Sequence, residues 1–227
     1  MIAMLLAAGR GERMRPLTDH TPKPLLPVGA KPLIVWHIEN LVQSGIRELV
    51  INHAHLGMQI EEALGDGGQF GAHIQYSREA TALETAGGIA NALPLLGDAP
   101  FAVINSDIFC RYDFTQLPER ATALASRGDD AHLVLVNNPE HHPGGDFGLE
   151  GGRIVNDGTR FTFSGIGIYR PSLFRDIPAG RGAPLAPLLR ARIALGKVSG
   201  ELYSGLWVDV GTPQRLSLLD HQLSTSS

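Results

Sequence analysis

The 227-residue sequence contains one cysteine, Cys110, and few aromatic residues. A single thiol excludes an intrachain disulfide framework and is typical of a reducing compartment. No apolar run approaches the roughly 20 residues that a membrane helix needs. The apolar opening, residues 2–8, is followed by Arg10, Arg13 and Arg15, which is the reverse of a secretory signal. We therefore expect a soluble, cytoplasmic protein.

The sequence also lacks an excess of positive charge. Its 19 Lys and Arg residues against 23 Asp and Glu residues give a formal net charge of -4. Proteins that bind nucleic acid or anionic membranes through their general surface are usually basic. We expect neither kind of partner, so any bound anion must be met by a local cluster of cations.

Short apolar segments bounded by Gly, Pro, Asp or Asn recur in the first 136 residues and predict buried strands. They are Ile2–Ala8, Glu48–His53, His73–Ser77, Phe101–Asn105 and His132–Val136. Helical spacing between them predicts helices over 32–45, 84–96 and 114–126. This alternation predicts one α/β domain over residues 1–227, with a mostly parallel sheet flanked by helices.

The pattern changes after residue 140, where glycines separate shorter apolar segments. We predict antiparallel strands over Phe147–Leu149, Arg153–Val155 and Phe161–Tyr169, which would form a small subregion on the same core. The tail, Ser224–Ser227, is predicted to be disordered.

A glycine-rich segment follows the first predicted strand. Gly9 and Gly11 allow the backbone to approach a phosphate closely. A dinucleotide fingerprint would need glycine in place of Met14, and the spacing of a Walker A loop is absent. Four of the nineteen basic residues lie here, which suits a triphosphate, although a mobile loop with solvated charges is the alternative. Four prolines favour a loop that is held in place.

The motif Gly9-x-Gly11-x-Arg13-x-x-Pro16-Leu17-Thr18, followed by Pro22-Lys23-Pro24, resembles the signature of sugar-1-phosphate nucleotidyltransferases. The resemblance implies a Rossmann-like fold of the glycosyltransferase-A type. Its nucleotide-binding part would span about residues 1–110 and its sugar-binding part about residues 130–210. It also implies that Arg13 and Lys23 are catalytic and contact the phosphates of a nucleoside triphosphate, with Ala7, Gly9 and Gly11 beside the nucleotide.

Two predicted strands end in aspartate, in Asn105-Ser106-Asp107 and in Trp207-Val208-Asp209. Each carboxylate could simply cap the turn that follows, which is a common use of Asp. Magnesium, however, typically takes one or two protein carboxylates. The family resemblance implies that Asp107 and Asp209 bind Mg²⁺.

Residues 79–89 are similar to the segment that encloses the base in this family. The resemblance implies nucleotide contacts from Glu79, Thr85, Gly87 and Gly88, whereas a plain helix N-terminus is the alternative. It implies sugar contacts from six residues: Asn105, Gly148, Glu150, Asn156, Ser164 and Trp207. Many relatives carry Glu-Lys-Pro where this chain has residues 155–160, and that departure indicates an unusual acceptor.

The whole pattern most resembles the family members that transfer UMP from UTP to N-acetylmuramic acid 1-phosphate (MurNAc-1-phosphate) in peptidoglycan recycling. A phosphosugar already carries an anionic oxygen, so catalysis reduces to alignment and charge stabilisation. Two alternatives stay open: a guanylyl- or cytidylyltransferase acting on mannose-1-phosphate or phosphocholine, and a non-catalytic paralogue that binds sugar nucleotides. No β-helix extension of the kind that trimerises some relatives follows the motifs, so we expect a monomer.

Four further features are predicted to be structural. His53-x-His55 and His141-His142 lack the spacing of a transition-metal site and are interpreted as surface or packing residues. Cys110 has no identifiable base beside it, and Trp36 is predicted to belong to the core.

Overall fold

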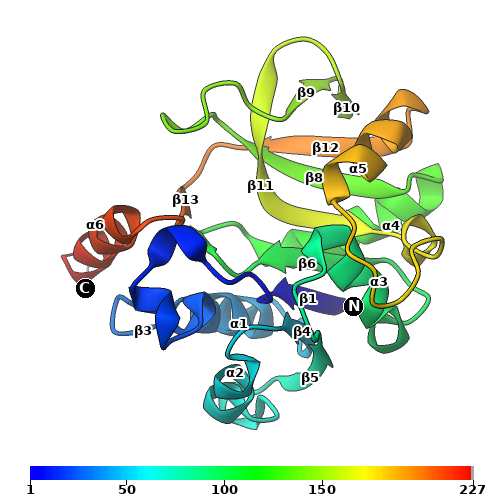
Figure 1. Cartoon of the computed structure of the whole chain (residues 1–227). Coiled ribbons are helices and arrows are strands. Elements are labelled where there is room, and N and C mark those ends of the chain that lie inside the picture. Colours follow the sequence, from blue (N-terminus) through cyan, green and yellow to red (C-terminus); the bar gives the residue numbers. More distant parts are fainter. Residues whose placement is uncertain (226–227) are drawn as a thin grey trace.

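The computed structural model describes residues 1–225 and contains a nine-stranded sheet with helices on both faces (Figure 1). The strand order is β5-β4-β1-β6-β11-β8-β12-β10-β9. In its first half all pairs are parallel, through β1 (Ile2–Leu6), β4 (Glu48–His53), β5 (His73–Arg78) and β6 (Phe101–Asn105). These strands are confirmed, although β1 ends two residues earlier than predicted.

The second half of the sheet is mixed. The long strand β11 (Arg160–Tyr169) runs antiparallel to both β6 and β8 (Ala131–Val136), and β12 (Val198–Tyr203) is parallel to β8. A hairpin of β9 (Phe147–Glu150) and β10 (Arg153–Val155) closes this edge. The Rossmann-like α/β fold is confirmed, but the sheet is mixed rather than mostly parallel, because the antiparallel strand β11 ends its parallel part.

The inner strands of the parallel half, β1, β4 and β6, are apolar on both faces because helices cover both, whereas the edge strand β5 alternates buried and exposed residues. Alternate residues of β1 point to opposite sides: Leu5 packs in the cluster with α1 (Leu33–Gln43), α2 (Gly57–Leu64) and α4 (Leu117–Arg127). Met4 packs in the other cluster, with α3 (Glu84–Leu96) and α5 (Leu185–Ala194). This arrangement places the ends of β1 and β6 between two helical layers.

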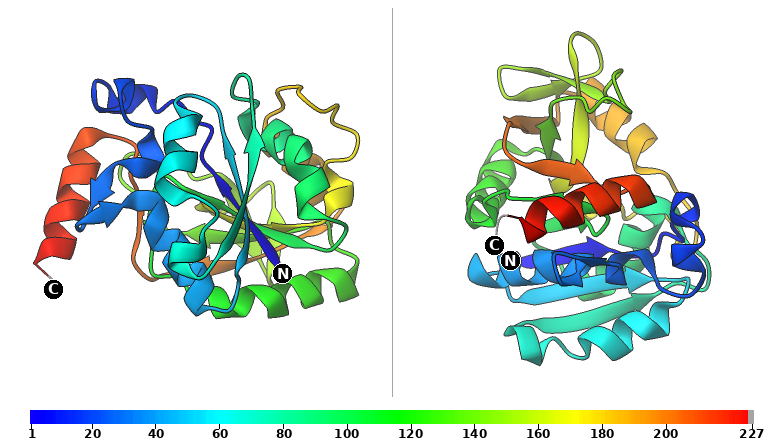
Figure 2. Two further views of the ribbon diagram at one scale, coloured as in Figure 1. Left: turned by 90° about the horizontal axis from the view of Figure 1, so that it is seen from below. Right: turned by 90° about the vertical axis from the view of Figure 1, so that its left-hand side faces the viewer.

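A smaller unit at the side of the sheet joins the two ends of the chain. It contains β7 (Ile108–Cys110) paired with β13 (Trp207–Asp209), the hairpin β2 (Pro27–Val28) and β3 (Lys31–Pro32), and α6 (Pro213–Ser224). Figure 2 shows α6, in red, beside the blue N-terminal segment. Gly29 N donates to Asp220 Oδ1 at 2.8 Å, which fastens α6 to the β2–β3 turn.

The helix α6 is absent from the sequence predictions, although its start has a clear signal. Thr212 Oγ1 accepts a hydrogen bond from Arg215 N at 3.3 Å, and Pro213 occupies the first helical position. Because Ser224 ends this helix, the prediction of a disordered tail is wrong there, and residues 226–227 lie outside the described residues. Among residues 1–225 no helix is long and apolar enough to cross a membrane.

Of the features predicted to be structural, Cys110 and His53 are buried and Trp36 packs half-buried against the core, whereas His55 is half-buried and His141 and His142 lie nearer the surface. Cys110 is buried in β7, and burial raises the pKa of its thiol to about 11. Trp36 packs edge-on against Phe109 with ring centroids 5.4 Å apart. His53 is buried and lies 2.7 Å from a carboxylate oxygen of Glu61.

Candidate active site

The glycine-rich segment is folded back on itself rather than extended into solvent. Thr18 Oγ1 donates to Gly11 O at 2.9 Å, and Gly11 has a φ of 70°. A Cβ atom at Gly11 would lie 3.0 Å from the Thr18 side chain and 3.3 Å from Lys23 Cβ, so only glycine fits without strain. At the start of the segment, Ala7 N donates to Asn52 Oδ1 at 2.9 Å. These contacts argue against the alternative of a mobile loop.

This segment forms one wall of a first cavity of about 370 Å³ at the ends of β1 and β6. The opposite wall comes from the start of α3. Eight of the predicted site residues line the cavity: Ala7, Gly9, Gly11, Arg13, Lys23, Thr85, Asn105 and Asp107. The cavity therefore brings the predicted phosphate-binding cations, one predicted metal ligand and part of the predicted base-binding segment together.

Three residues predicted to bind the nucleotide lie behind this wall instead. Glu79 is buried, and its carboxylate accepts hydrogen bonds from Asn52 Nδ2 at 2.6 Å and from Leu83 N at 2.8 Å. A Cβ atom at Gly88 would lie 2.8 Å from this Asn52–Glu79 pair, and one at Gly87 would collide with the backbone of residues 181–183. The two glycines allow close packing, and all three residues support the wall rather than face the cavity.

The ion pair at the centre of the site joins Lys23 and Asp107. Lys23 Nζ lies 2.8 Å from Asp107 Oδ2, and the lysine side chain is 9% exposed while the aspartate is 41% exposed. In an ion pair whose cation is buried and whose carboxylate is open to the cavity, the buried cation still needs an anionic partner when a ligand enters, and that partner can be the ligand. The pair thus presents both a cation and a carboxylate to the cavity.

The second aspartate is brought beside the first by the pairing of β7 with β13. Val210 N donates to Asp107 O at 2.9 Å, and both aspartates line a second cavity of about 310 Å³. Asp209 Oδ2 lies 3.1 Å from His141 Nε2 and 3.4 Å from Arg215 Nη1. His141 therefore lies beside Asp209 at the site, and its side chain is exposed, as expected for a surface residue.

A buried histidine fixes the strand that follows Asp107. His37 Nε2 lies 2.7 Å from Ile108 O, and burial lowers the pKa of His37 to about 4. The ring is neutral at pH 7, and Nε2 is the donor because a carbonyl can only accept. This hydrogen bond fixes the start of β7 against α1.

Two arginines face each other near Gly211. A Cβ atom there would collide with Arg215 Nη2 and would lie 3.1 Å from Arg13 Nη2. Arg215 Nε and Nη2 are buried without a hydrogen-bond partner among the described residues. Two neighbouring cations repel each other, so an anion bound between them is stabilised. The glycine makes room for this arrangement.

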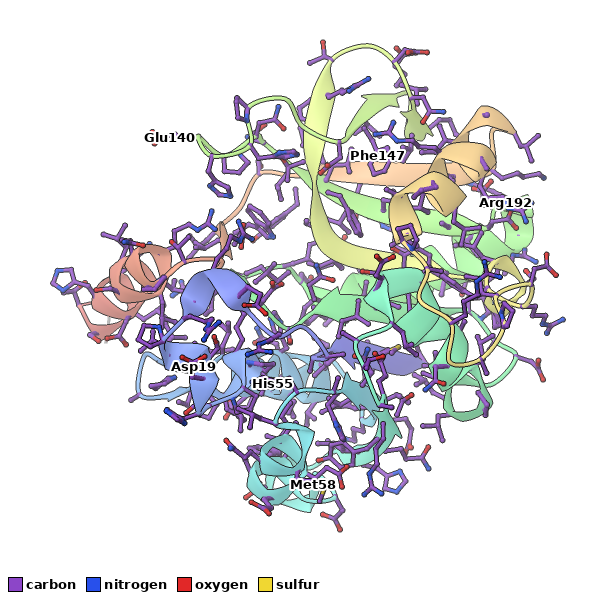
Figure 3. All side chains as sticks on the ribbon, viewed as in Figure 1. Asp19, His55, Met58, Glu140, Phe147 and Arg192 are labelled. Atoms are coloured by element: carbon purple, nitrogen blue, oxygen red, sulfur yellow. The ribbon has the colours of Figure 1, made fainter. Side chains whose placement is uncertain are left out.

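A third cavity, of about 390 Å³, continues from the other two toward α5. It shares Asn105 with both cavities, Thr85 with the first and Phe163 with the second. Phe147 lines it as well, and in Figure 3 this residue lies beside α5 while Arg192 lies at the outer edge of the molecule. Asn105 is the residue at which all three cavities meet.

The six residues predicted to bind the sugar divide into two groups. Ser164 and Trp207 line the second cavity along with Asn105, and Trp207 Nε1 donates to Ser164 O at 2.9 Å. The other three line none of the three cavities: Gly148, Glu150 and Asn156. Side chains alternate along β9, so with Phe147 facing inward the next residue faces away. A Cβ atom on that residue would collide with Asp157 O, and the prediction for these three positions finds no support in the geometry.

Residues 2–149 match the family model described as nucleotidyl transferase. This chain belongs to the nucleotidyl transferase family. It is 57% identical, over 95% of both chains, to the N-acetylmuramate alpha-1-phosphate uridylyltransferase of Neisseria meningitidis. It is 36% identical, over 94% of this chain and 93% of the relative, to the enzyme of the same name from Caulobacter vibrioides.

More distant members of the family have other acceptors in their names. The mannose-1-phosphate guanyltransferase of Aspergillus fumigatus is 32% identical over 94% of this chain, which spans 62% of that relative. A Bacillus anthracis protein assigned as a glucose-1-phosphate thymidylyltransferase, crystallised with sucrose, superposes with a TM-score of 0.86. It covers 99% of this chain and 96% of its own at 23% identity, which establishes the shared fold.

Several residues of this nucleotidyl transferase site escaped the sequence reasoning. Asn52 is the second-last residue of an apolar strand, and it lies level with Asn105 because both pair with Leu6 of β1; an asparagine at such a strand end is a signal that was available. Arg215 follows the second aspartate by six residues on the first turn of α6, so it is visible only once that helix is recognised. His141 and Arg190 have no local signal, because a loop and a distant helix bring them to the cavities.

Proposed function

We propose that this nucleotidyl transferase transfers UMP from UTP to MurNAc-1-phosphate, giving UDP-MurNAc and pyrophosphate, in peptidoglycan recycling. The observation that carries the proposal is the meeting of a cation-lined cavity and a carboxylate-lined cavity at Lys23 and Asp107. The choice of base and sugar is supported by the 57% identity to the uridylyltransferase of Neisseria meningitidis.

In the proposed reaction an oxygen of the sugar phosphate attacks the α-phosphorus of UTP. The new phosphorus–oxygen bond forms as the bond to the departing pyrophosphate breaks, and no proton has to move. Arg13 and Lys23 line the first cavity and neutralise charge on the α-phosphate and the leaving group. Arg215, beside Arg13 at Gly211, adds a third cation to this side.

The residues present fit a magnesium ion. The ion pairs of both aspartates use Oδ2, so among the described residues Oδ1 of Asp107 and Oδ1 of Asp209 are left for a hard cation. Within residues 1–225 no group of three or more His, Cys, Asp or Glu side chains forms a denser metal site, and magnesium needs only one or two carboxylates. Asp107 and Asp209 would hold the ion, which supplies positive charge to the reacting phosphate oxygens.

Pyrophosphate release tests the proposal directly. Each of UTP, GTP, CTP and dTTP is paired with MurNAc-1-phosphate, GlcNAc-1-phosphate, glucose-1-phosphate and mannose-1-phosphate in the presence of Mg²⁺. We expect the highest kcat/KM for UTP with MurNAc-1-phosphate. Preference for GTP with mannose-1-phosphate would support the alternative guanylyltransferase, and the absence of turnover with every pair would support a non-catalytic paralogue.

We also infer that the enzyme acts as a monomer in the cytoplasm, without nucleic acid or membrane partners. The most exposed large apolar side chains are Met58 on α2, Leu195 just after α5 and Leu218 on α6, so they come from three separate segments of the chain. The lone thiol is buried, as expected for a reducing compartment. Light scattering at micromolar concentration should give the mass of one chain, and the mass of a dimer would contradict this inference.

A further inference from the structure

Arg190 is the cation of the third cavity. It lies on the second turn of α5, and its guanidinium carbon is 5.1 Å from the centroid of the Phe147 ring. Its Nη2 donates to the backbone oxygen of Asp146 at 3.3 Å. Stacking on an aromatic ring restricts the guanidinium without using up its donors. Among the described residues that line this cavity, no other carries a positive charge.

Two nearby arginines of this half of the molecule have carboxylate partners. Arg192, two residues further along the same helix, lies 3.6 Å from Asp130, and Arg153 lies 2.7 Å from Asp129. For Arg190 the described part of the chain contains no ion pair with a carboxylate. Its charge is therefore available to a carboxylate that comes with a ligand.

The two acidic residues of the cavity do not take that role. Asp146 Oδ2 accepts from Phe163 N at 2.8 Å, and its Oδ1 lies 3.1 Å from His142 Nε2, so both oxygens are engaged. Glu84 lines the first cavity as well as the third, which places it at the border between them. Arg190 and Glu84 belong to different helices, α5 and α3, on the two sides of the cavity.

The second and third cavities share lining residues, so an acceptor sugar can extend from one into the other. A sugar phosphate placed beside Asp107 and Asp209 in the second cavity continues past Asn105 and Phe163 into the third. MurNAc differs from GlcNAc by one lactic acid ether on O3, which carries a carboxylate. An arginine fork matches a carboxylate with two parallel hydrogen bonds.

We propose that Arg190 binds the lactyl carboxylate of the acceptor and thereby selects the muramyl sugar over GlcNAc-1-phosphate. The inference rests on the proposed function and adds the residue that reads the acceptor. It assigns this role to a helix outside the motifs that hold the nucleotide and the metal.

The test compares kcat/KM for MurNAc-1-phosphate with kcat/KM for GlcNAc-1-phosphate, both with UTP. In Arg190→Gln we expect the ratio of the two to fall by about 10- to 100-fold, the effect of losing a hydrogen bond to a charged group. Arg190→Lys keeps the charge without the fork and should give an intermediate ratio. The matched control is Arg192→Gln, which should leave the ratio at the wild-type value.

A second substrate separates recognition from packing. With the lactyl carboxylate converted to its methyl ester, wild-type kcat/KM should fall by a similar factor, whereas Arg190→Gln should not discriminate between acid and ester. If Arg190→Gln leaves the ratio of the two kcat/KM values unchanged, whether or not both values fall, the role of Arg190 is overturned. If the wild-type enzyme itself does not prefer MurNAc-1-phosphate, the proposed function fails, and that result is seen before any variant is made.

Discussion

Two carboxylate–cation pairs of similar length lie in opposite surroundings. Lys23–Asp107 opens onto two cavities, with the aspartate 41% exposed. Asp129 is 4% exposed, and Arg153 donates to its two oxygens at 2.7 and 2.9 Å. The second pair fastens the β9–β10 hairpin to the segment before β8. Equivalent chemistry is proposed to serve the reaction at Lys23–Asp107 and holds the architecture at Arg153–Asp129, and the exposure of the carboxylate separates the two pairs.

The largest expected effect is on turnover at the open pair. Lys23→Ala or Asp107→Ala should lower kcat by at least about 100-fold, which is the scale for one preorganised electrostatic group. Lys23→Ala leaves only the exposed carboxylate and should keep a thermal midpoint close to that of the wild type, whereas Asp107→Ala leaves a buried ammonium without its partner and should lower the midpoint. Pyrophosphate release and a thermal scan check the two halves of this prediction, and near-normal turnover in either variant would contradict the proposed roles.

The closed pair should respond in the reverse way. Arg153→Ala leaves the buried carboxylate of Asp129 without its cation and should lower the free energy of unfolding by about 2 kcal/mol, reduced from the value for a fully buried pair because Arg153 is partly exposed. Urea unfolding measures this loss. The kcat of the folded variant should be unchanged. Arg175→Ala, which breaks an exposed pair with Asp98, is the control and should change stability very little.

Magnesium should stabilise the protein through Asp107 and Asp209 and not through the closed pair. At ten times its dissociation constant, an ion that binds only the folded state adds about 1.4 kcal/mol. We expect Mg²⁺ to raise the thermal midpoint of the wild type and of Arg153→Ala, but not that of Asp107→Ala or Asp209→Ala. An equal rise in all four proteins would place the ion elsewhere.

The smallest expected effect is a change in the free energy of unfolding at acid pH. Burial alone would raise the pKa of Asp129, but the hydrogen bonds and charge of Arg153 hold it below its ordinary value. The pKa of Asp129 is lower in the folded state than in the unfolded state. The stabilisation from the ion pair is therefore complete above the ordinary pKa of Asp, and it is lost as the pH falls toward the pKa of Asp129 in the folded protein. The difference in unfolding free energy between the wild type and Arg153→Ala should therefore shrink below about pH 4. A constant difference from neutral to acid pH would show that the pair contributes no charge interaction.

The inner strands of the parallel half could be predicted because they are covered on both faces and are therefore continuous apolar runs. Elements held by distant contacts could not. The helix α2 follows Leu56, which adopts a left-handed φ of 55° and gives no capping signal. The strand β12 contains Gly200, where the missing side chain makes room for Ile154 of β10. Such a glycine weakens the strand pattern in the sequence.

The same distinction holds for the site. Asp107, Asp209 and Asn105 lie at strand ends, and a strand end is fixed by its own local sequence. Gly148 and Asn156 depend on the direction of a hairpin, and one position along a strand reverses the face that a side chain covers. Arg190 depends on where α5 packs after a connection that carries no motif. The domain division at about residue 110 stays a prediction, since Asn105 serves all three cavities.

The two tryptophans of the chain lie in contrasting places, and this gives the protein an internal optical reporter. Trp36 packs against Phe109 under the N-terminal hairpin and lines none of the three cavities, whereas Trp207 lines the second cavity with its indole nitrogen tied to Ser164. Replacing Trp36 by phenylalanine would leave a single fluorophore in the second cavity, where the acceptor is proposed to bind. Its emission would then follow acceptor arrival and product release in real time, without any label.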